Sequence, residues 1–156
     1  MASRTLVIED EKATRRLAAR IAPLLKTGDV VTLAGDLGAG KTSFARALIQ
    51  TLSPGAGEVP SPTFTLVQVY DLAGLSVWHF DLYRLGEKEV DILELGWDEA
   101  RRSGAALVEW PDRLGRLLPK DRLEIMIATN KDSENSRTIT LTPCGTWQPR
   151  LKGTEL

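Results

Sequence analysis

The sequence has very few residues of the kinds that form disulfides or hold transition metals. Its 156 residues include one cysteine, Cys144, and one histidine, His79. A lone thiol excludes an internal disulfide framework, and one Cys with one His is too few for a zinc site built from these ligands. We therefore expect no structural metal.

Long apolar runs and an excess of either charge are also missing. No stretch approaches the roughly 18 apolar residues that cross a bilayer, and the first residues lack the apolar run of a signal peptide. The 20 basic and 21 acidic residues give a formal net charge of −1, so there is no overall basic footprint for nucleic acid. We expect a cytoplasmic protein with no membrane partner, which takes part in any RNA chemistry through a protein partner.

What remains is typical of one mixed α/β domain. The chain is 42% hydrophobic and 26% charged, and its length suits a single core. We find no internal repeat and no linker long enough to separate two domains. Residues 1–142 are therefore expected to form the domain, and residues 143–156 a flexible C-terminal tail.

Hydrophobic periodicity and turn residues give an approximate order of elements. Strands are predicted at 4–8, 30–34, 65–70, 76–80, 105–108, 122–129 and 137–142. Helices are predicted at 11–25, at 41–52, once or twice between 87 and 102, and at 112–118. Asp10 is suited to cap the first helix and Pro23 to kink it or end it early. The order predicts parallel strands near residues 30–34 and antiparallel strands toward the end.

Residues 35–42 carry the strongest motif. They read Gly-Asp-Leu-Gly-Ala-Gly-Lys-Thr and match G-x-x-x-x-G-K-[ST] at every specified position, between a buried strand and an amphipathic helix. Glycines let backbone N–H groups curl around phosphates, and the helix adds its positive N-terminal end. Lys41 would contact the β- and γ-phosphates and Thr42 would offer its hydroxyl to Mg²⁺. The residues predicted to bind ATP here are Asp36, Leu37, Gly38, Ala39, Gly40, Lys41, Thr42 and Ser43.

The fold predicted from this motif is a single P-loop NTPase domain, with a mixed parallel and antiparallel central sheet flanked by helices. Hydrolysis also needs a carboxylate near the metal and the attacking water. Glu109 ends the apolar strand 105–108, where such sheets gather functional groups. Asp81 ends the strand 76–80 in the same way. We predict Lys41, Asp81 and Glu109 as catalytic residues, with Thr42 and Glu109 on the metal. The pattern does not decide which carboxylate orients the water.

Several other residues are candidates with competing interpretations. Thr63 lies between prolines and a strand, and is either a γ-phosphate sensor or part of a turn. Trp110 either lines the nucleotide pocket or closes the edge of the core. Arg84 is either a charge clamp or a surface ion-pair partner. His79 is interpreted as a packed strand residue rather than a catalytic base.

Two other enzyme classes use a P-loop. A GTPase would explain Asp71-Leu72-Ala73-Gly74 as D-x-x-G, but Asn130-Lys131-Asp132-Ser133 has serine where the guanine-reading N-K-x-D needs a carboxylate. A small-molecule kinase would need an arginine-bearing lid, for which several arginines are available in no recognisable arrangement. Those arginines are Arg101, Arg102, Arg113 and Arg116. Outside enzymes, the alternative is a non-catalytic nucleotide-gated binding module.

The P-loop and three further segments occur together in an order that resembles a known family. The segments are Ser61-Pro62-Thr63-Phe64, His79-Phe80-Asp81-Leu82-Tyr83-Arg84-Leu85 and Val108-Glu109-Trp110-Pro111-Asp112-Arg113. The set resembles the TsaE (formerly YjeE) family of bacterial ATPases, required for synthesis of tRNA N6-threonylcarbamoyladenosine. The likeness extends from about Asp10 to Thr142.

This resemblance implies more than the motifs do alone. It implies slow intrinsic Mg-ATP hydrolysis coupled to a complex of TsaD and TsaB, which modifies the adenosine next to the tRNA anticodon. The chain would supply an ATP-driven step and meet tRNA indirectly, through that complex. By position, Lys41 would bind phosphate, Thr42 and Glu109 would serve Mg²⁺, and Asp81 would assist the metal or the water.

Overall fold

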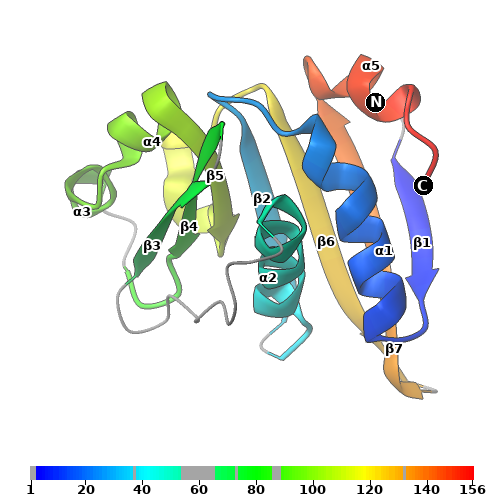
Figure 1. The fold of residues 1–156 in the computed structure, drawn as a ribbon. Helices are drawn as coiled ribbons and strands as arrows, with labels where there is room; N and C mark the ends of the chain where they lie inside the picture. Colours follow the sequence, from blue (N-terminus) through cyan, green and yellow to red (C-terminus); the bar gives the residue numbers. More distant parts are fainter. Residues whose placement is uncertain (1–2, 37, 54–65, 73, 86–88, 132) are drawn as a thin grey trace.

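The computed structural model describes residues 3–36, 38–53, 66–72, 74–85, 89–131 and 133–156 (Figure 1). The strands are β1 (Arg4–Ile8), β2 (Val30–Ala34), β3 (Val67–Leu72), β4 (Leu75–Asp81), β5 (Gly104–Glu109), β6 (Arg122–Asn130) and β7 (Ser133–Cys144). The helices are α1 (Glu11–Ile21), α2 (Lys41–Leu52), α3 (Glu89–Glu94), α4 (Trp97–Ser103) and α5 (Trp147–Lys152), with 3₁₀ turns η1 (Ala22–Leu24) and η2 (Pro111–Leu117). The predicted mixed α/β class is confirmed.

All seven strands belong to one sheet, in the order β1-β7-β6-β2-β5-β4-β3. The four central strands, β6, β2, β5 and β4, run parallel. At one edge β3 pairs antiparallel with β4, and at the other β7 and β1 continue antiparallel from β6. The parallel strands therefore end at one common edge of the sheet, and the P-loop follows β2 at this edge.

The sheet buries apolar side chains on both faces. Helices α1 and α2 lie on the same side of the sheet (Figure 1), where their apolar residues pack with Val31, Leu33 and Leu107. The opposite face packs Val30 and Phe80 against α3, α4 and η2. Because side chains alternate along a strand, neighbouring residues of β2 enter different cores. All of β2 from Val30 to Leu33 is buried, as its apolar run predicted.

The first helix begins where the sequence indicated and ends before Pro23, short of the predicted end at residue 25. The Asp10 side chain accepts a hydrogen bond of 2.9 Å from the backbone N–H of Ala13, which is an N-cap. α1 ends at Ile21, and Pro23 lies in η1 rather than in the helix. Proline has no N–H to donate and its ring crowds the preceding turn, so the regular helix stops before it.

The predicted hairpins form with shifted bounds. β3 and β4 pair around the turn after Leu72, and β6 pairs with β7 so closely that Asn130 faces Ser133. The turn around Lys131 is therefore shorter than the segment 131–135 expected from the sequence. Within the part of the chain that the structure describes, no helix is long and apolar enough to cross a membrane.

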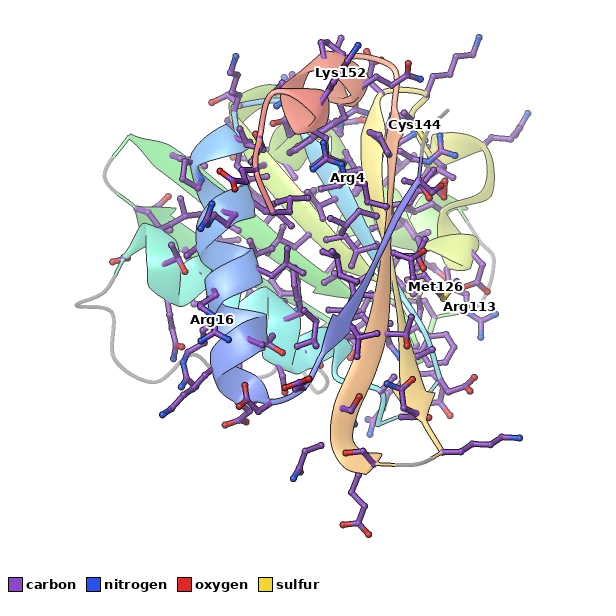
Figure 2. All side chains as sticks on the ribbon, turned by 90° about the vertical axis from the view of Figure 1, so that its right-hand side faces the viewer. Arg4, Arg16, Arg113, Met126, Cys144 and Lys152 are labelled. Carbon is purple, nitrogen blue, oxygen red and sulfur yellow. The ribbon has the colours of Figure 1, made fainter. Side chains whose placement is uncertain are left out.

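One face of the β1–β7–β6 edge is left without a helix. Val7 on β1 is 64% exposed and Met126 on β6 is 50% exposed. Figure 2 shows Arg16 of α1 and Met126 on opposite sides of this edge of the sheet. The described helices thus cover only one side of the antiparallel part of the sheet.

The C-terminal segment differs from the flexible tail expected after residue 142. β7 extends to Cys144, and α5 packs the fully buried Trp147 and Leu151 into the core beside α1 and α2. Arg150 donates to both carboxylate oxygens of Asp29, at 2.7 and 2.9 Å, and stacks over the Trp147 ring. The sequence did not predict α5, because a six-residue helix with two apolar residues four positions apart shows too little hydrophobic periodicity.

We expect the Trp147→Ala substitution to lower the free energy of unfolding by about 3–5 kcal/mol, because a fully buried indole is replaced by a cavity. Urea denaturation checks this, with Lys152→Ala, which alters an exposed side chain of the same helix, as the control. A loss below about 1 kcal/mol would mean that the C-terminal segment is a dispensable tail.

Candidate functional site

The site lies where β2, β4 and β5 end and α2 begins. Leu33 of β2 is in register with Glu109 of β5, and Glu109 is in register with Asp81 of β4. Because the three strands are parallel neighbours, both carboxylates lie beside the loop that follows β2. A cleft of about 350 Å³ is lined by Gly38, Gly40, Lys41, Thr42, Ser43, Asp81, Tyr83, Arg84, Glu109 and Trp110, and is called here the P-loop cleft.

The loop itself depends on glycine at particular points. Gly35 has φ of 150°, and a Cβ there would lie 2.3 Å from the backbone oxygen of Ile127 on β6. Gly40, with φ of 110°, turns the chain into α2, where the Phe44 N–H donates to its oxygen at 2.9 Å. Arg137 of β7 donates through Nε to the Ala39 oxygen at 2.9 Å, so a distant strand helps to hold the loop.

Lys41 is buried at the first position of α2. Its Nζ donates to the backbone oxygens of Gly35 and Asp36, at 2.7 and 2.9 Å. The same atom lies 4.4 Å from the centre of the Trp110 ring, within cation–π range. Burial lowers the pKa of Lys41 below its usual range, and the carboxylates of Glu109, Asp81 and Asp36 partly oppose this. The ammonium group therefore has strongly polar partners but little access to water.

Glu109 is a carboxylate buried to 2% exposure. The Thr42 hydroxyl is 2.8 Å from its Oε1 and 3.0 Å from its Oε2. His79 Nε2 lies 2.7 Å from Oε2. A buried carboxylate is costly unless it is hydrogen-bonded, and here two side chains from two elements contact it. His79 was expected to be a packed strand residue, and the structure adds that its ring contacts the candidate metal ligand.

Asp81 is the second carboxylate in the P-loop cleft, and it is 6% exposed. Its Oδ1 accepts a hydrogen bond of 3.1 Å from the backbone N–H of Tyr83. Its own N–H donates to the oxygen of Leu66 at 2.8 Å. The backbone on both sides of Asp81 is therefore constrained, and the carboxylate lies next to the strand that presents Glu109.

Trp110 has a left-handed backbone, with φ 61° and ψ 56°. Such a conformation is rare for a bulky residue and costs on the order of 1–3 kcal/mol, so it is kept only where the surroundings impose it. Its half-buried ring contacts Tyr83 at 5.0 Å between centroids, as well as Lys41. Tyr83 was not among the predicted site residues, because only the fold brings it to Trp110.

A second hollow of about 720 Å³ continues from the P-loop cleft past Gly40 and Ser43. It is called here the side groove, and it runs between the start of α1, the first turns of α2 and the beginning of β7. Its lining is strongly charged, with Lys12, Arg15, Arg46 and Arg137 together with Asp10, Glu11 and Glu134. Charged side chains thus line a continuous surface from the P-loop cleft into the side groove.

The structure brings together most of the predicted site residues but not all. Leu37 and Thr63 lie outside the described residues. Arg101, Arg102 and Arg116, raised as a kinase lid, line a separate hollow with no lining residue in common with the P-loop cleft.

The two segments that suggested a GTPase both lie at hairpins. Asp71, near the end of β3, accepts a hydrogen bond of 2.8 Å from the Ser76 hydroxyl. Asn130 adjoins the β6–β7 turn, where its amide is hydrogen-bonded to Ser136 and Thr138. None of the described residues of these two segments lines the P-loop cleft.

Comparison with known proteins gives consistent results. Residues 8–139 match the model of the family described as "Threonylcarbamoyl adenosine biosynthesis protein TsaE". The TsaE protein of Bacillus subtilis is 41% identical over 143 residues, which cover 91% of this chain and 85% of that protein. The TsaE protein of Haemophilus influenzae is 34% identical over 151 residues, covering 93% and 94%.

A solved structure agrees. The crystal structure of Bacillus subtilis YdiB superimposes with a TM-score of 0.77 and 32% identity, covering 97% of this chain and 92% of that one. The family match spans the P-loop, both carboxylates and the buried histidine described above. This chain therefore belongs to the TsaE family, which takes part in tRNA threonylcarbamoyladenosine biosynthesis.

Proposed function

We propose that this protein is a Mg²⁺-dependent ATPase that acts on the TsaD–TsaB complex. In that role it would support threonylcarbamoyl modification of the tRNA adenosine next to the anticodon. One observation carries the enzymatic part of the proposal. The Lys41 ammonium, the Thr42 hydroxyl and the Glu109 carboxylate meet in one cleft at the N-terminus of α2. The partners and the pathway step are inferred from the family to which the chain belongs.

On nucleotide binding, phosphate oxygens would replace loop oxygens as the hydrogen-bond acceptors of Lys41. Lys41 Nζ donates to two loop oxygens, and β- and γ-phosphate oxygens would be stronger acceptors for the same protons. They would also add negative charge beside an ammonium whose pKa is lowered by burial. Ser43 borders both the P-loop cleft and the side groove, which gives the sugar and base a continuous path from the phosphates.

The donor set fits Mg²⁺ when it arrives with phosphates. Mg²⁺ binds oxygen ligands and usually keeps several waters, taking only one or two from protein. Among the described residues there is no group of three or more His, Cys, Asp or Glu able to hold a metal without phosphates. The Thr42 hydroxyl and Glu109 carboxylate, 2.8 Å apart, are the oxygens that would hold the ion. Bound there, Mg²⁺ would neutralise charge that develops on the phosphates.

Glu109 and Asp81 would then have different roles. Both Glu109 oxygens contact the Thr42 hydroxyl, and this contact supports assigning Glu109 to the metal. Asp81 lines the same cleft from the adjacent strand and would orient the attacking water by accepting its proton in a hydrogen bond. Trp110 and Tyr83 would border the phosphates and limit the entry of further water.

The kinase alternative loses its main support, since none of the four arginines raised as a lid lines the P-loop cleft, and three of them line a separate hollow. A net charge of −1 fits a protein that reaches tRNA through partners better than one that binds its backbone directly. The alternative of a nucleotide-gated binding module differs from an ATPase in the rate of ATP turnover. Partners that accelerate this turnover indicate an ATPase, whereas slow turnover that the partners leave unchanged indicates a gated binding module.

Lys41→Ala should weaken ATP binding by at least about 2 kcal/mol, or roughly 30-fold, because the phosphates lose a charge-assisted hydrogen-bond donor. Isothermal titration calorimetry measures this directly. Lys120→Ala, which alters an exposed lysine outside both hollows, is the matched control. Equal affinity in Lys41→Ala and the wild type would remove Lys41 from the phosphate site.

Glu109→Gln should bind ATP with nearly normal affinity but hydrolyse it about 100-fold more slowly or worse. The amide preserves shape and can still accept hydrogen bonds, whereas the negative charge needed beside Mg²⁺ in the transition state is lost. Single-turnover hydrolysis with pre-bound nucleotide separates the two effects, and Glu99→Gln on the surface of α4 is the control. Near-normal turnover would exclude Glu109 from catalysis.

Purified TsaD and TsaB should raise the steady-state ATP turnover of this protein several-fold, with little effect on GTP. Lys41→Ala assayed with the same partners reports contaminating ATPase activity. If the partners leave turnover unchanged while the protein alone hydrolyses ATP, the enzyme assignment stands and the proposed client is wrong.

A further inference from the structure

His79 is fully buried at 0% exposure, on the strand next to the one that ends in Glu109. Its Nε2 is 2.7 Å from Glu109 Oε2. Its Nδ1 has no hydrogen-bond partner among the residues that the structure describes. Among the described residues, Glu109 is therefore the one hydrogen-bond partner of this ring. A carboxylate oxygen only accepts, so Nε2 carries the proton and donates it.

The register of the sheet brings this contact about. Val77, His79 and Asp81 are alternate residues of β4 and project to the same face, while Trp78 and Phe80 enter the opposite core. Leu107 and Glu109 project to that same face from β5. His79 thus approaches the Glu109 carboxylate from within the core, beneath the P-loop cleft, and does not itself line the cleft.

Thr42 alone does not define the orientation of this carboxylate. Its hydroxyl oxygen is almost equally close to both carboxylate oxygens, at 2.8 and 3.0 Å, and has a single proton to donate. If Thr42 turns a lone pair toward Mg²⁺, as proposed above, its one proton can still be donated to either Glu109 oxygen, so Thr42 does not select between them. The His79 hydrogen bond is directed at Oε2 alone and comes from the side away from the cleft, so it persists when the metal site fills.

We infer that His79 is a positioning residue, which holds Oε2 of Glu109 so that Oε1 is presented to the metal. The inference rests on the proposed function and goes beyond it by assigning a role to the one histidine of the chain. Hydrogen-bond donors behind a ligating carboxylate typically change metal affinity or activity by about 10- to 100-fold when they are removed. A histidine that only fills space would change stability instead.

The test compares His79→Gln with His79→Asn. The glutamine amide nitrogen has about the same reach as Nε2 and can donate to Glu109, whereas the asparagine amide is too short. Phe80→Leu, which alters the adjacent buried residue facing the other core, is the control for a loss of packing alone. If His79→Asn does not fold, His79→Leu takes its place. Thermal unfolding shows that each variant is folded.

The main readout is metal affinity rather than turnover. Free Mn²⁺ is followed by electron paramagnetic resonance during titration of each protein with a non-hydrolysable ATP analogue present, and nucleotide affinity is measured separately without metal. We expect His79→Asn to bind Mn²⁺ about 10-fold more weakly or worse, with metal-free nucleotide affinity unchanged. His79→Gln should stay within a few-fold of wild type, and Phe80→Leu should alter only the melting temperature.

Mn²⁺ affinity in His79→Asn equal to that of wild type would overturn the inference, even if the variant melted earlier. Equal weakening in the glutamine and asparagine variants would overturn it as well, because the donor would then not be the cause. Wild-type protein that does not bind Mn²⁺ with the nucleotide analogue would instead refute the proposed Mg²⁺-ATP site. The two failures are thus distinguishable in one experiment.

Discussion

The buried carboxylate of Glu109 is the constraint on which the site depends. A negative charge at 2% exposure is tolerated only if donors surround it, and Thr42 and His79 supply them from two different elements. The contact with Thr42 ties the first turn of α2 to the end of β5. The contact with His79 ties β5 to β4. One carboxylate thereby connects the loop, the helix and the two strands that border the P-loop cleft.

Sheet topology makes this arrangement possible. Because β2, β5 and β4 are parallel neighbours, their ends meet at one edge, and the alternation of side chains directs Glu109, Asp81 and His79 to the face covered by α2. The other face can then be mainly apolar, with the Phe80 ring packed against Trp78 and Trp97. The antiparallel strands β7 and β1 lie outside this centre, and β7 contributes Arg137 to the P-loop.

Helix caps, the bounds of several elements and the residues at strand ends were predictable from the sequence, because they depend on residues close together in the chain. The helix cap at Asp10, the bounds of β2 and α2, and the positions of Asp81 and Glu109 at strand ends all follow from short patterns. Contacts between distant segments did not follow. The Arg137 contact with the P-loop, the Tyr83–Trp110 pair and the packing of α5 join residues that no local pattern relates. The role of His79 belongs to the same class, since register between strands determines it.

The most direct test of the central claim is a crystal structure of this protein with Mg²⁺ and a non-hydrolysable ATP analogue. The prediction is that Lys41 Nζ leaves the oxygens of Gly35 and Asp36 for the phosphates, and that the metal lies between Thr42 and Glu109 while His79 still contacts Oε2. A nucleotide bound elsewhere, or a metal that does not approach Glu109, would contradict the claim.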